Sequence, residues 1–437
     1  MGSVARRALP MVALLVAAIL AWPSPMAAFS GFGALSADAK YGGEMRFTVQ
    51  LPGGAPDKLE LLLRFTGSDS TFVASVSATG SSAQYVWDTV ARPLTPNTGV
   101  AYRWRATQGQ TVTLSPEKNL IYDDDRPGLD WHSARIGAAT VHWYGGAEAQ
   151  ARHFGQITAD AAKAAETLFG HDLAGPVDIF VYVSHDDFFG ALGPGAREWT
   201  GAATFPNLRT IFMWLQGGSS SYLETTMTHE VTHVVFRDAT ANPFHEPAKW
   251  FNEGLAVWSE QHSANAEAAT VRSAASAGAL LAFDGISESF PIGDQPARLA
   301  YAEGATMVQM IIDTHGRGAI AKIAAALRDG AGDDQALEAG TGIPAEKLYA
   351  AYFDSFGVQA PAAVKPAPLL SSNVDKPPQP AASGNGQPAE SAAPTGQPSA
   401  ASAGDLGWVL GILVAGLAVG VLVAIIAQRR RRSGGSA

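Results

Sequence analysis

Alternation of apolar and polar residues predicts a series of β-strands in the first third of the chain. In residues 43–51 and again in 59–65, every second residue is a large apolar one, which gives each segment one apolar face. Clusters of Gly, Pro, Asn and Ser separate these from further short candidates at 71–76, 84–90, 100–106 and 111–114. Several short strands within about 90 residues predict a β-sandwich of immunoglobulin or fibronectin type over residues 29–122.

A different pattern predicts an α+β layout for residues 133–357. Strands are expected at 136–144, 177–183 and 210–214. The alanine-rich segment 147–169 has a helical pattern, and helical patterns continue almost to residue 357. Strands first and helices afterwards indicate a small sheet beside a helical half.

The boundary between these two parts is expected near residues 122–131. Three aspartates, Asp123 to Asp125, stand there before an Arg-Pro-Gly sequence. A solvated turn between domains is the favoured interpretation, because the carboxylates lack the ligand spacing of an EF-hand. A calcium site at these aspartates is the alternative.

Two apolar segments lie outside the predicted folded parts. Residues 1–28 combine two arginines, an apolar run and a small-residue end, which is the order of a secretory signal peptide; an N-terminal membrane anchor is the alternative. Residues 406–427 carry no charge and are followed by four arginines, which predicts a transmembrane helix; a buried soluble helix is the alternative. The positive-inside rule then places the short basic tail, 428–437, in the cytoplasm and the bulk of the protein outside the cell.

Residues 358–404 are rich in Pro, Ala, Ser, Gly and Gln, which predicts a disordered linker.

Composition and charge exclude several classes of function. The predicted exported part, residues 29–404, has 24 basic and 39 acidic residues, a net charge of −15. Such a chain, with no basic stripe, is not expected to bind nucleic acid. The absence of cysteine excludes disulfides, thiolate zinc sites and a cysteine nucleophile.

The motif with the clearest chemistry is an HExxH pattern formed by His229, Glu230 and His233. Serines at 219–221 can cap a helix there, and neither Pro nor Gly interrupts it before Asp238. Four residues turn a helix through about 400°, so the two histidines project from nearly the same face, about 6 Å apart along the axis. Two imidazoles so placed can share one metal ion, and Glu230 can take a proton from a water molecule beside it.

A carboxylate for the same ion is available in the next predicted helix, residues 249–260. Catalytic zinc takes three protein ligands, and two histidines with one glutamate form an established set. Glu253 completes that set. Gly254 has no side chain and is expected to let the HExxH helix and the Glu253 helix approach closely.

With these residues the sequence resembles the gluzincin metallopeptidases, the group of thermolysin and aminopeptidase N, and in particular bacterial peptidase MA-like proteins. The segment WFNEGLAVWSE matches the WLNEG(F)A signature of aminopeptidase N at Trp250, Asn252, Glu253, Gly254 and Ala256. The resemblance covers residues 133–357 and implies a zincin-like fold. It implies that zinc binds His229, His233 and Glu253, that Glu230 activates water, and that Tyr301, ahead of His315 and Gly316, stabilises the oxyanion.

The sequence departs from the family pattern in two places. Thr204 stands where aminopeptidases carry the glutamate that holds a free amine, which favours cleavage within chains; residues 201–212 can still bind an extended peptide by edge pairing. Val257 replaces an aspartate that orients a histidine in thermolysin-like enzymes, and Asp238 and Glu260 are the remaining candidates for that role.

Two further residues, His245 and Glu246, lie in a proline-bounded loop between the two predicted helices. A solvated loop is the favoured interpretation, with a metal or substrate role as the alternative.

The prediction is therefore a zinc-dependent endopeptidase acting on peptides or proteins at the outer face of the cell membrane, held by a single-pass anchor. The alternative is a zincin fold without catalytic activity that serves as a surface binding or adhesion protein. The sequence does not set the oligomeric state.

Overall fold

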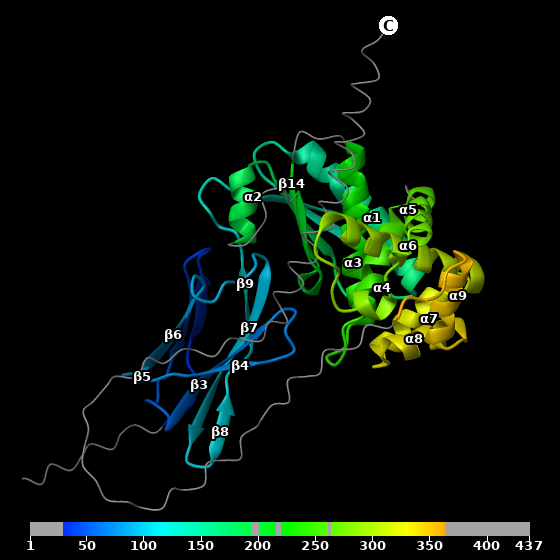
Figure 1. The fold of residues 1–437 in the computed structure, drawn as a ribbon. Coiled ribbons are helices and arrows are strands. Elements are labelled where there is room, and N and C mark those ends of the chain that lie inside the picture. The colour runs from blue at the N-terminus through cyan, green and yellow to red at the C-terminus, as the bar shows by residue number, and fades with distance from the viewer. Residues whose placement is uncertain (1–28, 194–200, 216–219, 261–263, 363–437) are drawn as a thin grey trace, which may run out of the picture.

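A computed structural model describes residues 29–193, 201–215, 220–260 and 264–362 (Figure 1). The predicted signal peptide, the transmembrane segment 406–427, the basic tail and all but the start of the linker lie outside these residues. Across the described part, none of the helices has the length and apolar character needed to cross a bilayer.

The N-terminal part consists of antiparallel strands in two sheets. One sheet has the order β1-β2-β6-β5, and the other has the order β4-β3-β7-β8, with β9 also paired to β7. The strands are β1 (Leu35–Ala39), β2 (Glu44–Gln50), β3 (Lys58–Phe65), β4 (Phe72–Ser75), β5 (Ala78–Thr79), β6 (Ser82–Asp88), β7 (Thr98–Gln108), β8 (Thr111–Leu114) and β9 (Lys118–Tyr122).

Alternation along these strands places one side chain in two in a common core. Phe47 of β2, Leu61 of β3 and Trp104 of β7 are fully buried and belong to one hydrophobic cluster drawn from both sheets. The predicted β-rich N-terminal part is confirmed. The pattern missed the strands β1, β5 and β9, because their alternation is too short or too exposed to stand out.

The second part is built on a mixed sheet with the order β10-β11-β12-β14-β13. Its strands are β10 (His132–Ile136), β11 (Ala139–Trp143), β12 (Val177–Tyr182), β13 (Ala202–Phe205) and β14 (Thr210–Trp214). Strands β11, β12 and β14 run parallel, whereas β10 and β13 are antiparallel to their neighbours. Strand β13 is therefore one edge of this sheet.

The prediction of a single strand over 136–144 is wrong at its start. Residue Ile136 ends β10, and the chain turns at Gly137 before β11 begins at Ala139. Gly137 has a φ of 54°, a left-handed conformation that glycine adopts without steric cost. The turn makes a hairpin of a segment whose composition alone suggests one continuous strand.

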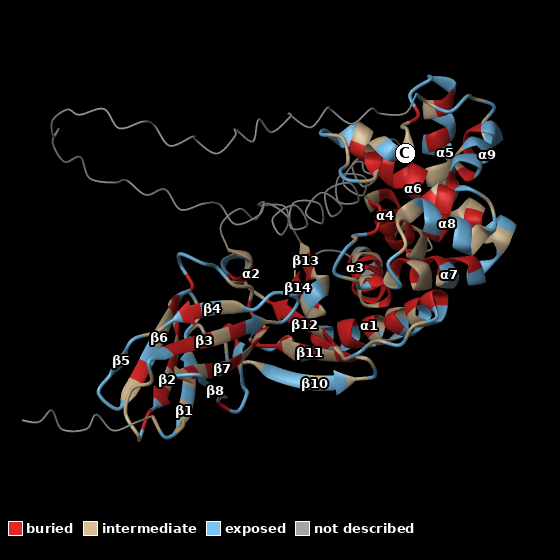
Figure 2. Ribbon diagram, turned by 90° about the horizontal axis from the view of Figure 1, so that it is seen from below, coloured by how far each residue is buried: buried red, intermediate tan, exposed pale blue. Residues whose placement is uncertain are grey.

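Helices make up the rest of the second part. They are α1 (Glu148–Phe169), α2 (His185–Leu192), η1 (Pro206–Leu208), α3 (Ser220–Thr240), α4 (Lys249–Ser259), α5 (Ala264–Ser276), η2 (Phe283–Ile286), α6 (Asp294–His315), α7 (Arg317–Arg328), α8 (Asp333–Thr341) and α9 (Ala345–Ser355). Helices α1 and α3 lie between the sheet and the remaining helices, α4 to α9 (Figure 1, Figure 2). A domain rich in helices thus follows the β-rich part, as predicted.

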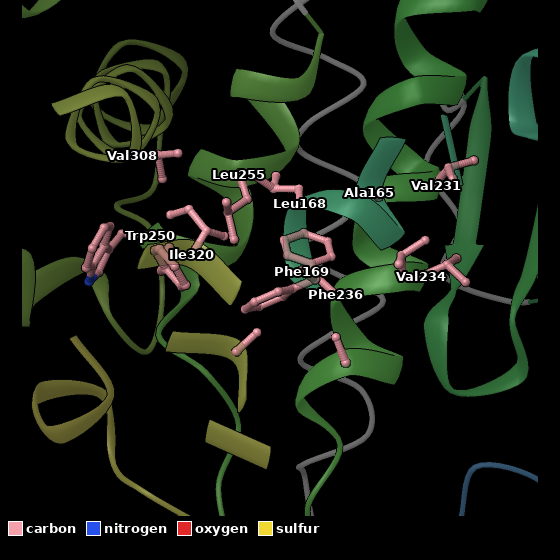
Figure 3. Packing of buried hydrophobic residues seen from close by; sticks show 14 of the residues in the cluster. Ala165, Leu168, Phe169, Val231, Val234, Phe236, Trp250, Leu255, Val308 and Ile320 are labelled. Carbon is pink, nitrogen blue, oxygen red and sulfur yellow. The ribbon is translucent and has the colours of Figure 1, made fainter. Parts of the chain in front are cut away.

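One continuous core holds α1, α3, α4, α6 and α7 together. Figure 3 shows Phe169 of α1, Phe236 of α3 and Leu255 of α4 among its buried side chains. The rings of Phe169 and Phe236 have centroids 5.3 Å apart. The ring of Phe236 also packs against Phe251 of α4, with centroids 5.7 Å apart, which fixes the helices of the HExxH motif and Glu253 relative to each other.

Helices α4 and α6 cross in contact at a pair of glycines. A Cβ atom added to Gly254 would lie 2.5 Å from the carbonyl carbon of Gly304, and one added to Gly304 would lie 2.4 Å from the carbonyl oxygen of Trp250. Any side chain at either position would push the helices apart. The expectation that Gly254 brings α4 toward α3 is wrong about the partner: it brings α4 toward α6, the helix of Tyr301.

The aspartates between the two parts act as structural acceptors. Asp124, 2% exposed, accepts hydrogen bonds from the Arg126 guanidinium at 2.6 and 2.5 Å and from the Tyr182 hydroxyl at 3.1 Å. Asp125 accepts the backbone N–H of Tyr41 in the β-rich part. These bonds connect the turn to both parts of the chain, and Asp124 is buried rather than solvated as expected.

Candidate metal centre

Helix α3 carries His229, Glu230 and His233 on a rigid support. Its residues Val231, Val234 and Val235 are fully buried in the core that α3 shares with α1. Burial of one side of the helix leaves the histidine side facing α4. The helix predicted around the HExxH motif therefore exists, and its core contacts fix the direction of both imidazoles.

Three potential ligand atoms meet between α3 and α4. The Nε2 atoms of His229 and His233 are 3.1 Å apart, and Glu253 Oε2 lies 3.7 Å from the first and 3.5 Å from the second. The three residues are between 2% and 5% exposed. The structure thus brings together the three residues that the sequence singled out as metal ligands.

The far nitrogen of each imidazole is held by an acceptor on α4 or just after it. His229 Nδ1 is 2.7 Å from Glu260 Oε1, and His233 Nδ1 is 2.9 Å from Asn252 Oδ1. Because each partner is an oxygen acceptor, each Nδ1 carries a hydrogen, and in a neutral imidazole the Nε2 atom keeps a free lone pair. Such outer partners fix the tautomer and orientation of metal-binding histidines.

Of the two residues proposed to orient a histidine, only Glu260 does so. Asp238 instead accepts the backbone N–H of Ala174 at 2.8 Å and lies 3.4 Å from His171 Nε2, away from the metal ligands. Asn252 was missed as an orienting residue. Its signal was present in the sequence, because it directly precedes Glu253 on a helix facing the histidines.

The arrangement fits a zinc-sized ion. Two Nε2 lone pairs at 3.1 Å cannot bond to each other, so they require a cation or a proton between them. A tetrahedral ion with bonds of about 2.0–2.1 Å has ligand atoms about 3.3 Å apart. The observed separations of 3.1, 3.5 and 3.7 Å lie around that value. Within the described residues, Glu253 Oε2 has no hydrogen-bond partner.

The electrostatics of the site also favour a bound cation. Burial alone would raise the pKa of Glu253, but His233 and His229 hold that pKa far below its ordinary value. Burial would lower the pKa of His229, but the neighbouring carboxylates of Glu253 and Glu260 raise it well above normal. The Glu253 carboxylate thus stays charged and stabilises positive charge beside it.

Glu230 and Tyr301 complete the surroundings of the three ligands. Glu230 is 2% exposed, and its Oε2 has no hydrogen-bond partner in the described residues. Tyr301 of α6 is 6% exposed, and its hydroxyl is likewise without a partner there. Burial, followed by the charges of Glu253, Glu230 and Glu260, raises the pKa of Tyr301 well above its ordinary value. The hydroxyl therefore remains a neutral hydrogen-bond donor beside the carboxylates.

The remaining candidates lie away from the metal ligands. His245 Nε2 is 3.2 Å from Asp333 Oδ1, and Glu246 is paired with Arg237 at 3.8 Å. Thr204 is buried in the edge strand β13, which packs against α3. His245 and Glu246 thus have partners outside the group of three ligands, and Thr204 is a neutral residue at its position on β13.

Comparison with known proteins finds a family model that matches part of the chain. Residues 158–355 match the family model described as the Peptidase MA superfamily. The span contains α3, α4 and α6, and the resemblance to peptidase MA-like proteins is confirmed. The match indicates a peptidase. No curated protein matches the chain.

Several solved structures are similar to parts of the chain. An aminopeptidase N family protein from Idiomarina loihiensis has 9% identity and a TM-score of 0.34, covering 67% of this chain and 70% of its own. A two-domain M1 zinc metallopeptidase mutant bound to L-arginine has 11% identity and a TM-score of 0.31, covering 74% and 91%. BhCBM56, in a bromine derivative, has 7% identity and a TM-score of 0.17, covering 20% and 88%. Similarity this weak adds nothing to the argument for function.

Removing the acceptor of His229 is expected to weaken metal binding without unfolding the protein. The substitution Glu260→Ala frees the imidazole to rotate and to change tautomer, so zinc affinity should fall roughly 10- to 100-fold in a chelator competition assay. The matched control is Asp238→Asn. Asp238 lies on α3 but contacts none of the three proposed ligands, so this substitution should leave zinc affinity unchanged. Equal affinities for Glu260→Ala and the unsubstituted protein would contradict the orienting role.

Helix α6 carries a buried carboxyl, Glu303, that is not part of the metal centre. Glu303 is fully buried, and its Oε1 accepts the backbone N–H of Leu281 at 2.9 Å. Its Oε2 has no hydrogen-bond partner in the described residues. Burial raises the pKa of Glu303 from 4.5 to about 8, so this carboxyl is protonated at neutral pH.

This raised pKa predicts how stability changes with pH. The folded state binds the proton more tightly than the unfolded state, so the stability present below pH 4.5 is lost as pH rises toward 8. Glu303→Gln cannot ionise and should be more stable than the unsubstituted protein at pH 8, by on the order of 3 kcal/mol, with no gain at pH 4.5. Urea unfolding at both pH values measures this difference. The exposed Glu338→Gln serves as control, and a gain that does not depend on pH would count against the mechanism.

Proposed function

We propose that this chain is a zinc-dependent metallopeptidase that cleaves peptide bonds within polypeptides at the outer face of the cell membrane. One observation carries the proposal: His229, His233 and Glu253 aim three free ligand atoms at one buried point, while Glu260 and Asn252 fix the tautomer of both imidazoles. Without a cation or a proton between them, the two Nε2 lone pairs would oppose each other in the interior.

The residues around the ligands have different roles in peptide-bond hydrolysis. When bound, zinc would act as a Lewis acid on the scissile carbonyl and make water a stronger acid. Glu230, with a free carboxylate oxygen, takes the proton of the attacking water and delivers it to the leaving amine. The Tyr301 hydroxyl, neutral and without another partner in the described residues, donates a hydrogen bond to the oxyanion.

Cleavage within chains follows from the edge strand. Strand β13 packs against α3 and leaves one of its sides without a neighbouring strand in the described sheet. An extended substrate can pair with such an edge through backbone hydrogen bonds, in either direction from the cleaved bond. Thr204 on this strand has no negative charge to bind a free amine, so a substrate whose N-terminus lies there gains no binding energy over a longer one.

The position at the membrane rests on the sequence of the terminal segments. Residues 406–427 are uncharged and precede Arg429 to Arg432, and residues 1–28 have the order of an export signal. We assign the N-terminal part, whose two sheets enclose one core, to the immunoglobulin or fibronectin type of sandwich. Protease treatment of intact cells checks the topology: the folded part should be digested, and its protection would contradict export.

Substitution of the general base separates catalysis from metal binding. Glu230→Gln should retain zinc and lose roughly 100-fold or more in kcat on an internally quenched peptide with a blocked N-terminus, because proton transfer contributes on that scale. Glu246→Gln, in the loop after the same helix, should behave like the unsubstituted protein. Tyr301→Phe, tested in parallel, should lower kcat at unchanged zinc content.

The same assay identifies the alternatives. Zinc without turnover in any form of the protein would indicate a binding or adhesion protein that keeps the fold. Activity confined to peptides with a free N-terminus would contradict cleavage within chains. Full activity of Glu230→Gln would refute the assignment of the base.

A further inference from the structure

A large cavity lies behind the metal centre, between α1, α3, α4, α5, α6 and α9. Its volume is about 990 Å³, at the upper end of the range for small-molecule sites. Glu260, which holds His229, forms part of its wall. His229, His233, Glu253 and Tyr301 are absent from its described lining, so the cavity is separate from the proposed catalytic centre.

The walls of this cavity combine apolar and aromatic surface. Leu168 of α1, Val257 of α4 and Met310 of α6 supply aliphatic surface, and Trp258, Tyr352 and Phe356 contribute rings. One ring already attracts a cation: the guanidinium carbon of Arg317 lies 5.2 Å from the centroid of the Trp258 ring. Aromatic faces stabilise organic cations in this way, most strongly where water is excluded.

The charges around the cavity are mainly negative. The lining contains two arginines, Arg272 and Arg317, and five carboxylates: Asp160, Glu224, Glu260, Glu267 and Asp313. This imbalance reflects the whole second part of the chain. Residues 123–362 hold 14 basic and 30 acidic residues, a net charge of −16, whereas residues 29–122 hold 8 basic and 7 acidic residues. The field in this half therefore attracts cations and repels anions.

We propose that the cavity is a binding site for an organic cation with an apolar body, of the alkylamine or quaternary ammonium class. The apolar walls accept the body, while the rings and carboxylates complement the positive head. Anions of the same shape meet five carboxylates against two arginines and are repelled by the net negative charge. This site goes beyond the proposed peptidase activity and does not depend on it.

Calorimetric titration of the full-length, zinc-loaded protein tests the proposal. The probe is hexyltrimethylammonium, and hexanesulfonate is the matched anion with the same alkyl chain. We expect the cation to bind with a Kd of about 1 mM or tighter and the anion to bind at least 10-fold more weakly. Equal binding of both probes, or no binding of the cation, would overturn the proposal.

A substitution that fills the cavity locates the site. Ala164 is an exposed residue of α1 in the cavity wall, so Ala164→Trp should weaken binding of the cation 10-fold or more. Thr167→Trp places the same side chain on α1 outside the described lining and should bind as the unsubstituted protein does. Unchanged binding by Ala164→Trp would place the cation elsewhere and refute the assignment.

A charge substitution gives an independent measurement that leaves the shape of the cavity unchanged. Asp313 is exposed and accepts a hydrogen bond from Gln309, which an asparagine oxygen can also accept. Asp313→Asn should weaken cation binding about 2- to 5-fold, the usual effect of one exposed charge. Asp329→Asn, an exposed aspartate outside the described lining, should have no effect. Equal affinities for the two variants would contradict the role of the carboxylates.

Discussion

Two imidazole nitrogens with free lone pairs, 3.1 Å apart in the interior, set the main constraint on this fold. Their orientation is not free to change, because Glu260 and Asn252 accept from the opposite nitrogens. Such a pair is stable only around positive charge, and Glu253 supplies the negative charge that balances it. The packing of α3 against α4 therefore depends on what lies between the two histidines and the glutamate.

The crossing of α4 and α6 transmits this constraint to the third helix of the site. Gly254 follows the ligand Glu253 directly, and Gly304 lies three residues after Tyr301. Since the two glycines touch backbone to backbone, the distance between ligand and hydroxyl is set by main-chain contact rather than by adaptable side chains.

Patterns of neighbouring residues predicted the structural features that depend on local backbone geometry alone. The alternation in 43–51 and 59–65 gave the buried faces of β2 and β3, and the spacing of His229 and His233 gave two imidazoles on one face of a helix. What the sequence could not give depends on which elements meet. Gly254 was assigned to the wrong partner helix, and the hairpin at Gly137 was read as one strand, because neither the crossing nor the turn leaves a periodic signal. Glu260 was one of two equal candidates until the fold placed Asp238 beside Ala174 instead.

Glu260 has a position that no local pattern could define. In thermolysin-like enzymes the orienting carboxylate stands four residues after the ligand glutamate, whereas here Val257 occupies that place and the carboxylate comes one helical turn later. The change leaves one wall of the cavity behind the metal centre with Val257 and Glu260 side by side in its lining. A carboxylate that both holds His229 and lines this cavity joins two sites by a single side chain, with one hydrogen bond between the cavity wall and a metal ligand.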